Sequence, residues 1–342
     1  YVAASSRTMH ALFEGRFDDA ERLAQRTLEI GDRMPGLDAA GVYGVQLFTL
    51  RREQGRLDEV GPVVRHFVQS QPESNIWRPG LALIYTELGQ LEEARTQFET
   101  LAADGFRTLV RDGAWVASMT YLAQVCSALA DAERADILYS LLQPYSGRNL
   151  LAGTSIACFG AADAVLGSLC ATMKRWTQAE RHFIAALALN ERQGARPALA
   201  HARYHYASML LARHDGADRQ TAENLLEAAA HDAGALGMRA LAARIDACRA
   251  PMMSGAASTR YPAGLSEREA QVLSFVAAGK SNRQIALELF VSPNTVANHV
   301  RSILSKTHST NRTEAAAFAI RHALSERTQP SGSSPHAKNS AM

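Results

Sequence analysis

Apolar residues recur at intervals of three and four along most of the chain, which is the period of amphipathic α-helices. Short polar turns separate these helical stretches, and no sustained alternation of apolar and polar residues predicts a large sheet. The pattern therefore predicts an all-α protein. We expect a helical body at residues 5–248, a linker at 249–263, a compact four-helix module at 264–327 and a disordered tail at 328–342.

The body is weakly repetitive. Turn-and-start segments recur near residues 15–20, 55–60, 89–94, 131–133, 174–179 and 218–222, at spacings from 34 to about 44 residues. This is the range of helix-hairpin repeats. The unit from Leu81 to Phe98 resembles a tetratricopeptide repeat, and residues 166–186 repeat much of it. We expect an irregular tetratricopeptide-like solenoid, with Ala94 and Ala179 allowing close helix approach and Phe98 and Phe183 filling the gaps between hairpins.

The C-terminal module has four closely spaced helix starts. Three have the form of a capping box, in which a short polar side chain and a residue three positions later satisfy free N–H groups of the first turn. The fourth is a serine followed by proline at the first helical position. The starts are Ser266 with Glu269, Ser281 with Gln284, Asn311 with Glu314, and Ser292 with Pro293.

The third helix of this module has two contrasting faces. Val296, Val300 and Ile303 form an apolar stripe that we expect to pack on the second helix. The opposite face offers hydrogen-bonding groups suited to base edges in the DNA major groove, where arginine pairs with guanine and asparagine with adenine. The candidate base-contact positions are Asn294, Ala297, Asn298 and Arg301.

Charge is distributed unevenly along the chain. The net charge of +2 combines about +5 from Arg260 onward with about −3 before it. A basic module on a mildly acidic body is the expected electrostatic footprint of a DNA-binding protein. Candidate phosphate contacts, which position a protein without reading sequence, are Lys280, Ser281, Asn282, Ser292, Thr295, Lys306 and Arg312.

Residues 264–324 resemble the LuxR-type C-terminal helix-turn-helix domain of bacterial transcription regulators. The family motifs L-S/T-x-R-E, G-x-S/T-N-x-x-I-A, S-x-x-T-V-x-x-H-V and N-R-T-E-A correspond to residues 265–269, 279–286, 292–300 and 311–315. The family often has lysine where Ala297 stands, so one usual base contact is absent. The resemblance also implies dimerisation through the last helix, at Ala315, Ala316, Ala319, Ile320 and Ala323.

Helical repeats followed by this domain look like the C-terminal half of the large ATP-dependent LuxR-type activators. That resemblance implies an upstream nucleotide-binding module, which residues 1–342 do not contain. The first residues already lie inside a repeat-like pattern and begin at Tyr1. We therefore expect the chain to be the C-terminal part of a longer polypeptide.

Motifs for catalysis are not found. Gly279-Lys280-Ser281 mimics the end of a P-loop, but Ser274 stands where its first glycine is required. His201 and His205 lie one turn apart without a third metal ligand, and we interpret them as part of a solvated helix face. The four widely spaced cysteines are typical of buried, reduced thiols. We expect a cytoplasmic protein that is not an enzyme and has no cofactor or membrane span.

These features predict a transcription regulator that binds double-stranded DNA as a homodimer. We expect the repeats to bind an effector or a protein partner. A second interpretation stays open: an interaction scaffold whose helix-turn-helix contacts a protein such as RNA polymerase.

Overall fold

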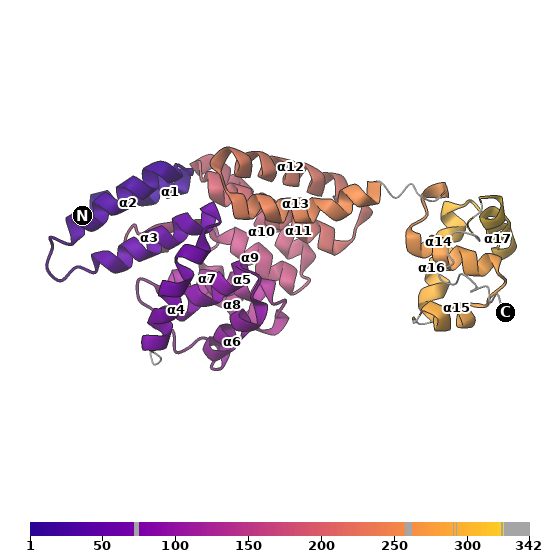
Figure 1. Ribbon diagram of the computed structural model, residues 1–342, viewed down its shortest axis with the longest axis horizontal. Coiled ribbons are helices and arrows are strands. Elements are labelled where there is room, and N and C mark those ends of the chain that lie inside the picture. The colour runs from indigo at the N-terminus through magenta and orange to yellow at the C-terminus, as the bar shows by residue number, and fades with distance from the viewer. Residues whose placement is uncertain (72–74, 257–261, 290, 292, 323, 325–342) are drawn as a thin grey trace, which may run out of the picture. The chain divides into compact units, whose positions relative to one another are not determined.

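The computed structural model describes residues 1–71, 75–256, 262–289, 291, 293–322 and 324. The chain divides into two compact units, Tyr1–Arg249 and Ala250–Met342, and helices dominate both of them (Figure 1). In the part of the chain that is described, no helix is both long enough and apolar enough to cross a membrane.

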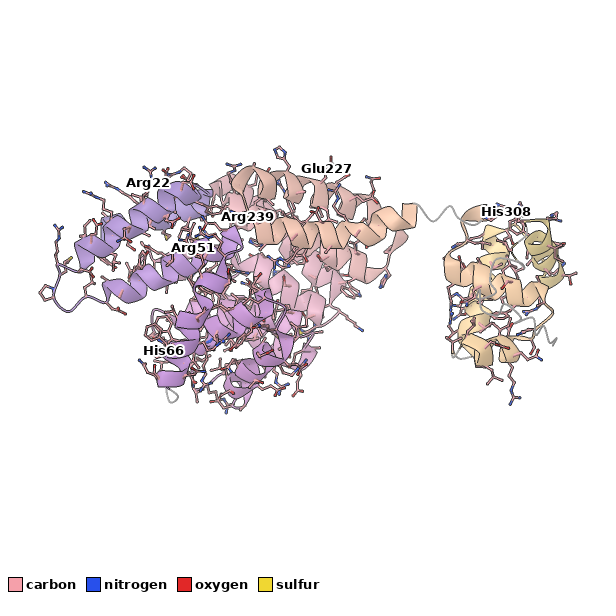
Figure 2. All side chains as sticks on the ribbon, viewed as in Figure 1. Arg22, Arg51, His66, Glu227, Arg239 and His308 are labelled. Carbon is pink, nitrogen blue, oxygen red and sulfur yellow. The ribbon has the colours of Figure 1, made fainter. Side chains whose placement is uncertain are left out.

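The N-terminal unit is a succession of helix hairpins in which most helices pack on a neighbour along the chain, as α1 does on α2, α9 on α10 and α11 on α12. Charged side chains such as Arg22 and Glu227 lie on its outside (Figure 2). Its elements are α1 (Val2–Glu14), α2 (Phe17–Gly31), α3 (Ala39–Gln54), η1 (Leu57–Glu59), α4 (Gly61–Ser70), α5 (Arg78–Glu87), α6 (Leu91–Ala102), α7 (Trp115–Ala128), α8 (Ala132–Leu142), η2 (Gln143–Tyr145), β1 (Asn149–Ala152), β2 (Ala157–Ala161), α9 (Ala162–Thr172), α10 (Trp176–Gln193), α11 (Arg196–Arg213), η3 (Gly216–Asp218), α12 (Arg219–Leu236) and α13 (Arg239–Ala256).

The repeated turns share one backbone conformation. Each of six helix ends carries a residue with positive φ, the left-handed region in which glycine has no steric penalty. Three of these positions hold glycine and three hold a residue with a Cβ atom. The six residues and their φ angles are Gly15 (79°), Gly55 (71°), Gly89 (75°), Ala130 (54°), Lys174 (58°) and His214 (57°).

The packing expected inside the hairpins is confirmed. Ala94 and Ala179 are fully buried, and Phe98 and Phe183 are each 1% exposed. The ring of Phe183 lies against Gly167 of α9 so closely that a Cβ atom there would sit 3.1 Å from the ring. Small residues therefore set the separation of the helices, and phenylalanines fill the space between them.

A β-hairpin interrupts the helices. β1 and β2 pair antiparallel between α8 and α9, with Leu151 opposite Cys158, so these residues depart from the all-α expectation. Gly160 has a φ of 76°, and a Cβ atom there would lie 2.4 Å from the Cβ of Ala198. Only glycine permits this close approach of β2 to α11.

The first helices of the unit pack on elements that come much later in the chain. α1 and α3 both contact β2, and α1 also contacts α11. Ser5 donates to the carbonyl oxygen of Ser155 at 3.0 Å, and the Gln46 amide donates to that of Ile156 at 3.1 Å. These bonds join residues more than a hundred positions apart. An interior space of the same unit is lined by α1, α3, α7, β2, α9 and α11.

The C-terminal unit contains η4 (Pro262–Gly264), α14 (Glu267–Ala277), α15 (Asn282–Leu289), α16 (Pro293–Lys306) and α17 (Arg312–Arg321). The expected linker at 249–263 is partly helical, because α13 continues to Ala256. Its remaining positions 257–261 and the predicted tail at 328–342 lie outside the described residues.

The cysteines carry no disulfide in the part of the chain that is described. Cys126 and Cys170 are buried, whereas Cys158 and Cys248 are half-buried. Burial raises the pKa of the Cys126 thiol to about 12 and that of Cys170 to about 11. These two side chains therefore act as small apolar core residues rather than as nucleophiles.

Candidate nucleic-acid interface

The helix starts of the C-terminal unit are capped largely as the sequence predicts. Ser266 and Glu269 form the full reciprocal box, in which the Ser266 N–H donates to the carboxylate at 2.8 Å. The Ser281 N–H likewise donates to the Gln284 side chain at 2.8 Å. The third box differs, because Glu314 accepts from the N–H of Thr310 rather than from that of Asn311.

The apolar stripe of α16 packs on α15, as expected, and α16 also contacts α14. Val296 is fully buried and Ile303 is 1% exposed, in one cluster with Ile285 and Leu289 of α15. Val300 and Val291 pack against the same cluster from its edge. This packing fixes the rotation of α16, so that the opposite side of the helix faces solvent.

Two candidate base-contact side chains lie on that exposed side. Asn298 and Arg301 are both exposed, and the Arg301 guanidinium donates to Asn298 Oδ1 at 3.0 Å. Ala297 is half-buried beside them. The side chain of Asn294 lies outside the described residues, as does Ser292. An exposed Asn–Arg pair on one helical turn offers the two side-chain types that pair bidentately with adenine and guanine.

Another group of candidates meets where α15 begins. Arg312 of α17 donates to Asn282 Oδ1 at 2.8 Å and to the carbonyl oxygen of Lys280 at 2.6 Å. Lys280 itself pairs with Glu288 at 2.7 Å and lies over the Phe275 ring. The half-buried Arg312 is thus engaged inside the unit, and its geometry suits positioning the start of α15 better than direct phosphate contact.

Lys306 lies at the other end of α16 and binds a carboxylate of α14. Its Nζ donates to Glu269 Oε2 at 2.7 Å, and Ser302 donates to Glu269 Oε1 at 2.6 Å. Burial opposes ionisation of Glu269, but these donors and the Ser266 N–H outweigh it and lower its pKa to about 2. Glu269 is therefore ionised, and it joins the cap of α14 to α16.

The dimerisation face predicted on α17 needs correction. Ala315 and Ala319 are 1% and 0% exposed and belong to the core of the C-terminal unit itself. Ala316 also packs against that core, so the small residues serve helix packing within one copy. Ile320 is 64% exposed and stays available for a partner, and Ala323 lies outside the described residues.

Sequence reasoning missed two arginines. Arg268 donates to the carbonyl oxygen of Leu289 at 2.9 Å, which ties the end of α15 to α14. Arg283 is exposed near the start of α15, and among the described residues it has no ion-pair partner. Its position next to Asn282 was the available signal, and it makes Arg283 a better phosphate-contact candidate than Arg312.

The interpretation of His201 and His205 as a solvated helix face is wrong. Their side chains border the interior space of the N-terminal unit, and His201 Nε2 lies 2.9 Å from Glu53 Oε2. No group of three metal-ligating side chains occurs among the residues that the structure describes.

Comparison with known proteins shows which family the C-terminal unit resembles. Residues 263–319 match the family described as bacterial regulatory proteins, luxR family. The chain is 47% identical over 60 residues to the uncharacterized transcriptional regulatory protein YhcZ of Bacillus subtilis, and 43% identical over 60 residues to the transcriptional regulatory protein LiaR of the same organism. Each match covers 18% of this chain and 28% of the relative.

A longer match involves the DNA-binding transcriptional activator DevR/DosR of Mycobacterium tuberculosis, with 35% identity over 111 residues. It covers 32% of this chain and 49% of that protein, so the chain spans no more than about half of these relatives. Among solved structures, a Rap protein complexed with competence and sporulation factor aligns with 94% of this chain and 96% of its own, at a TM-score of 0.42 and 15% identity.

Proposed function

Because residues 263–319 form a LuxR-family helix-turn-helix domain, we propose that this chain is a transcription regulator that reads double-stranded DNA with α16. The observation that carries the proposal is the exposed pair of Asn298 and Arg301 opposite the buried Val296 and Ile303. Base contacts by Arg301 and Asn298 would supply sequence preference, each good pair contributing roughly 1–3 kcal/mol of discrimination.

Phosphate contacts would come from the rim of the same surface. Ser281, Arg283 and Thr295 border the starts of α15 and α16, where helix N-termini favour anionic groups. Lys280 is bound to an exposed carboxylate in the free protein, so it would exchange Glu288 for a phosphate. Lys306 would keep its bond to Glu269 and use its other N–H groups for a phosphate. Such exchange makes binding dependent on salt, with each neutralised phosphate contributing about −0.9 to the slope of log K against log[salt].

Regulation would come from the N-terminal unit. Stacked helix hairpins present extended and enclosed surfaces suited to an effector or a protein partner. We also propose a dimer on DNA, with Ile320 at the contact, since two copies would read an inverted repeat. Its place of action would be the cytoplasm, where bacterial DNA lies.

The test is selection of random duplex DNA by the intact chain, followed by binding to the enriched site at several salt concentrations. The proposal predicts a defined site and a negative salt slope. Analytical ultracentrifugation of the complex then counts the copies bound per site. No enriched sequence from folded protein would contradict DNA readout, and complexes with only one copy per site would contradict the dimer.

A further inference from the structure

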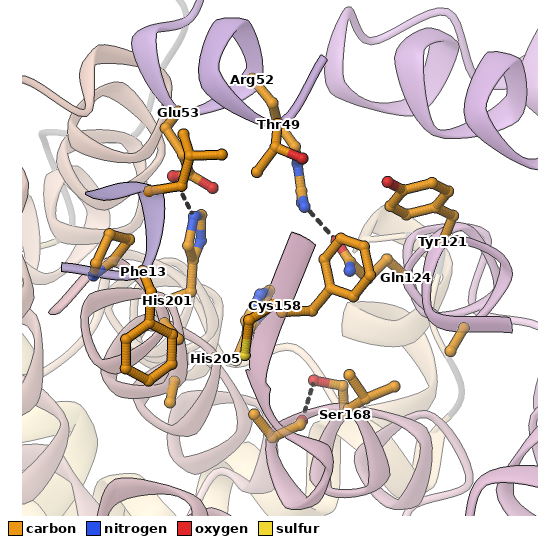
Figure 3. Close-up of a pocket in the computed structure, with 18 of the residues that line it drawn as sticks. Phe13, Thr49, Arg52, Glu53, Tyr121, Gln124, Cys158, Ser168, His201 and His205 are labelled. Atoms are coloured by element: carbon orange, nitrogen blue, oxygen red, sulfur yellow. Dashed lines mark hydrogen bonds and ion pairs between the residues drawn. The ribbon is translucent and has the colours of Figure 1, made fainter. Parts of the chain in front are cut away.

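The interior space of the N-terminal unit is a cavity of about 100 Å³ (Figure 3). α1, α3, α7, β2, α9 and α11 all contribute to its wall. Several side chains in the wall are half-buried rather than buried, including Phe13, His201 and His205, so solvent reaches the space. About 10–15 Å³ of such space is enough for one water, so the cavity has room for several waters or for a small ring compound.

The charges around the cavity are paired with one another. Arg52 donates to Glu87 at 2.6 Å, and Arg244 lies 3.2 Å from the same carboxylate. Glu53 binds His201 at 2.9 Å. Burial opposes ionisation of Glu87, but the two arginines outweigh it and lower its pKa to about 2. A charged ligand would have to compete with these ion pairs for its counter-charge.

Two polar groups in the cavity wall have no hydrogen-bond partner among the described residues. They indicate a ligand that is held by hydrogen bonds rather than by charge. The Tyr121 hydroxyl and the His205 imidazole make no hydrogen bond to any other residue in the described ranges, although both line the cavity. Burial, together with the charges of His201, Arg244 and Arg52, lowers the pKa of His205 to about 3, so the ring is neutral and has one donor and one acceptor.

Aromatic side chains supply an apolar wall beside these groups. Phe48 and Phe159 both line the cavity, and each ring centroid lies 5.4 Å from that of Tyr121. Gln124 borders the same space, with its carbonyl oxygen accepting from Arg52 (Figure 3). Small-molecule sites in proteins commonly have this composition, a mostly apolar wall with a few placed polar groups.

We propose that this cavity binds a small, uncharged molecule with a flat apolar ring and an amide or hydroxyl group. The ring packs on Phe48 and Phe159, and the polar group bonds to the Tyr121 hydroxyl and the His205 imidazole. That this ligand is an effector of DNA binding rests on the proposed function; that the cavity binds it does not.

Three ring compounds of nearly equal shape test the charge class. Benzamide is neutral, benzoate is an anion and benzamidine is a cation. Binding of each to the intact chain is measured by saturation-transfer NMR and calorimetry. We expect a millimolar dissociation constant for benzamide, which suits so small a fragment, and at least tenfold weaker binding of the two ions. Absence of benzamide binding, or tighter binding of either ion, would overturn the proposal.

Variants locate the site. Tyr121→Phe and His205→Phe remove the unpartnered polar groups without breaking any described hydrogen bond, and each should weaken benzamide binding about threefold to tenfold. Tyr145→Phe is the matched control, because Tyr145 packs on Trp115 in the same unit and does not line the cavity. Equal affinity of all four proteins would overturn the assignment.

Binding to the enriched DNA site is measured separately with the same proteins. If DNA binds and benzamide does not, the cavity proposal fails alone. If benzamide binds and no DNA does, the cavity stands and the proposed function fails.

Discussion

Lys306 at the end of α16 donates to Glu269 in the first turn of α14, with 2.7 Å between Nζ and Oε2. The same carboxylate completes the cap of α14 and accepts from Ser302, so one side chain holds two helices in register. The helix that presents Asn298 and Arg301 to solvent is thereby fixed to the helix it packs on.

Replacing Glu269 should therefore loosen the whole C-terminal unit. Glu269→Gln keeps the shape of the side chain but removes its charge, and we expect a loss of about 1.5–3 kcal/mol, the usual value for a buried charged hydrogen bond. Hydrogen exchange of the backbone amides in α14 and α16 of the intact chain measures this loss of stability. Glu288→Gln is the control, since that carboxyl is 51% exposed and its pair with Lys280 should contribute under 1 kcal/mol. Equal exchange in both variants would contradict this role.

Acid should destabilise the N-terminal unit through His205. The folded pKa of about 3 lies below the usual histidine value of about 6.5, so the unfolded chain takes up a proton between these values while the folded chain does not. The contribution of His205 to the free energy of unfolding is therefore fully present above pH 6.5. It falls as the pH drops toward 3, by at most about 1.4 kcal/mol per pH unit.

Thermal melts of His205→Phe and the wild type at pH 7.5 and 5 test this effect. The variant should lose less stability on acidification than the wild type. His66→Phe, at an exposed position, should follow the wild type (Figure 2). An unchanged acid response in His205→Phe would contradict the assigned pKa.

The repeated turns predict a stabilising substitution. Ala130 is exposed and has a φ of 54°, a conformation that costs a residue with a Cβ atom roughly 1–2 kcal/mol. Ala130→Gly should raise the melting temperature by about 1–3 °C after the entropy cost of glycine is subtracted. The reverse change, Gly89→Ala, should lower it, because Gly89 has a φ of 75° and no neighbour within 4 Å of a new Cβ. Shifts of the same sign in both would contradict the turn argument.

The contact of Gly167 with Phe183 gives a packing prediction. Gly167→Ala places a methyl group 3.1 Å from the ring and should destabilise the N-terminal unit by about 1–3 kcal/mol. Gly234→Ala, in helix α12 with open space around it, should instead stabilise by about 0.5–1 kcal/mol. Urea unfolding separates the two outcomes, and stabilisation by both changes would contradict close packing at Phe183.

Local signals in the sequence predicted the local structure. Ser266 with Glu269 gave the start of α14, and the glycine at position 89 gave a turn, because such residues act on backbone groups within a few positions. The recurrence of apolar residues at intervals of four and three on α16 likewise predicted which side of the helix is buried. These features do not depend on distant parts of the chain.

Contacts between distant residues were not predictable in the same way. Long-range packing brings His201 of α11 beside Glu53 of α3 in the wall of a cavity, although helical spacing alone suggested a solvated face. The β-hairpin at 149–161 is too short to outweigh the surrounding helical pattern. The family resemblance implied that Ala315 and Ala319 form a dimer contact, and one helix face cannot reveal whether it is covered by the same copy or by another.

The most direct test of the central claim compares Arg301→Ala with Arg321→Ala on the DNA site selected by the wild type. Both residues are exposed arginines of the C-terminal unit, but only Arg301 lies on α16. We predict that Arg301→Ala weakens binding by about 5- to 150-fold, corresponding to roughly 1–3 kcal/mol, and relaxes the preference at one base pair. Arg321→Ala should keep the preference unchanged. Equal affinity and equal base preference in the two variants would contradict DNA readout by α16.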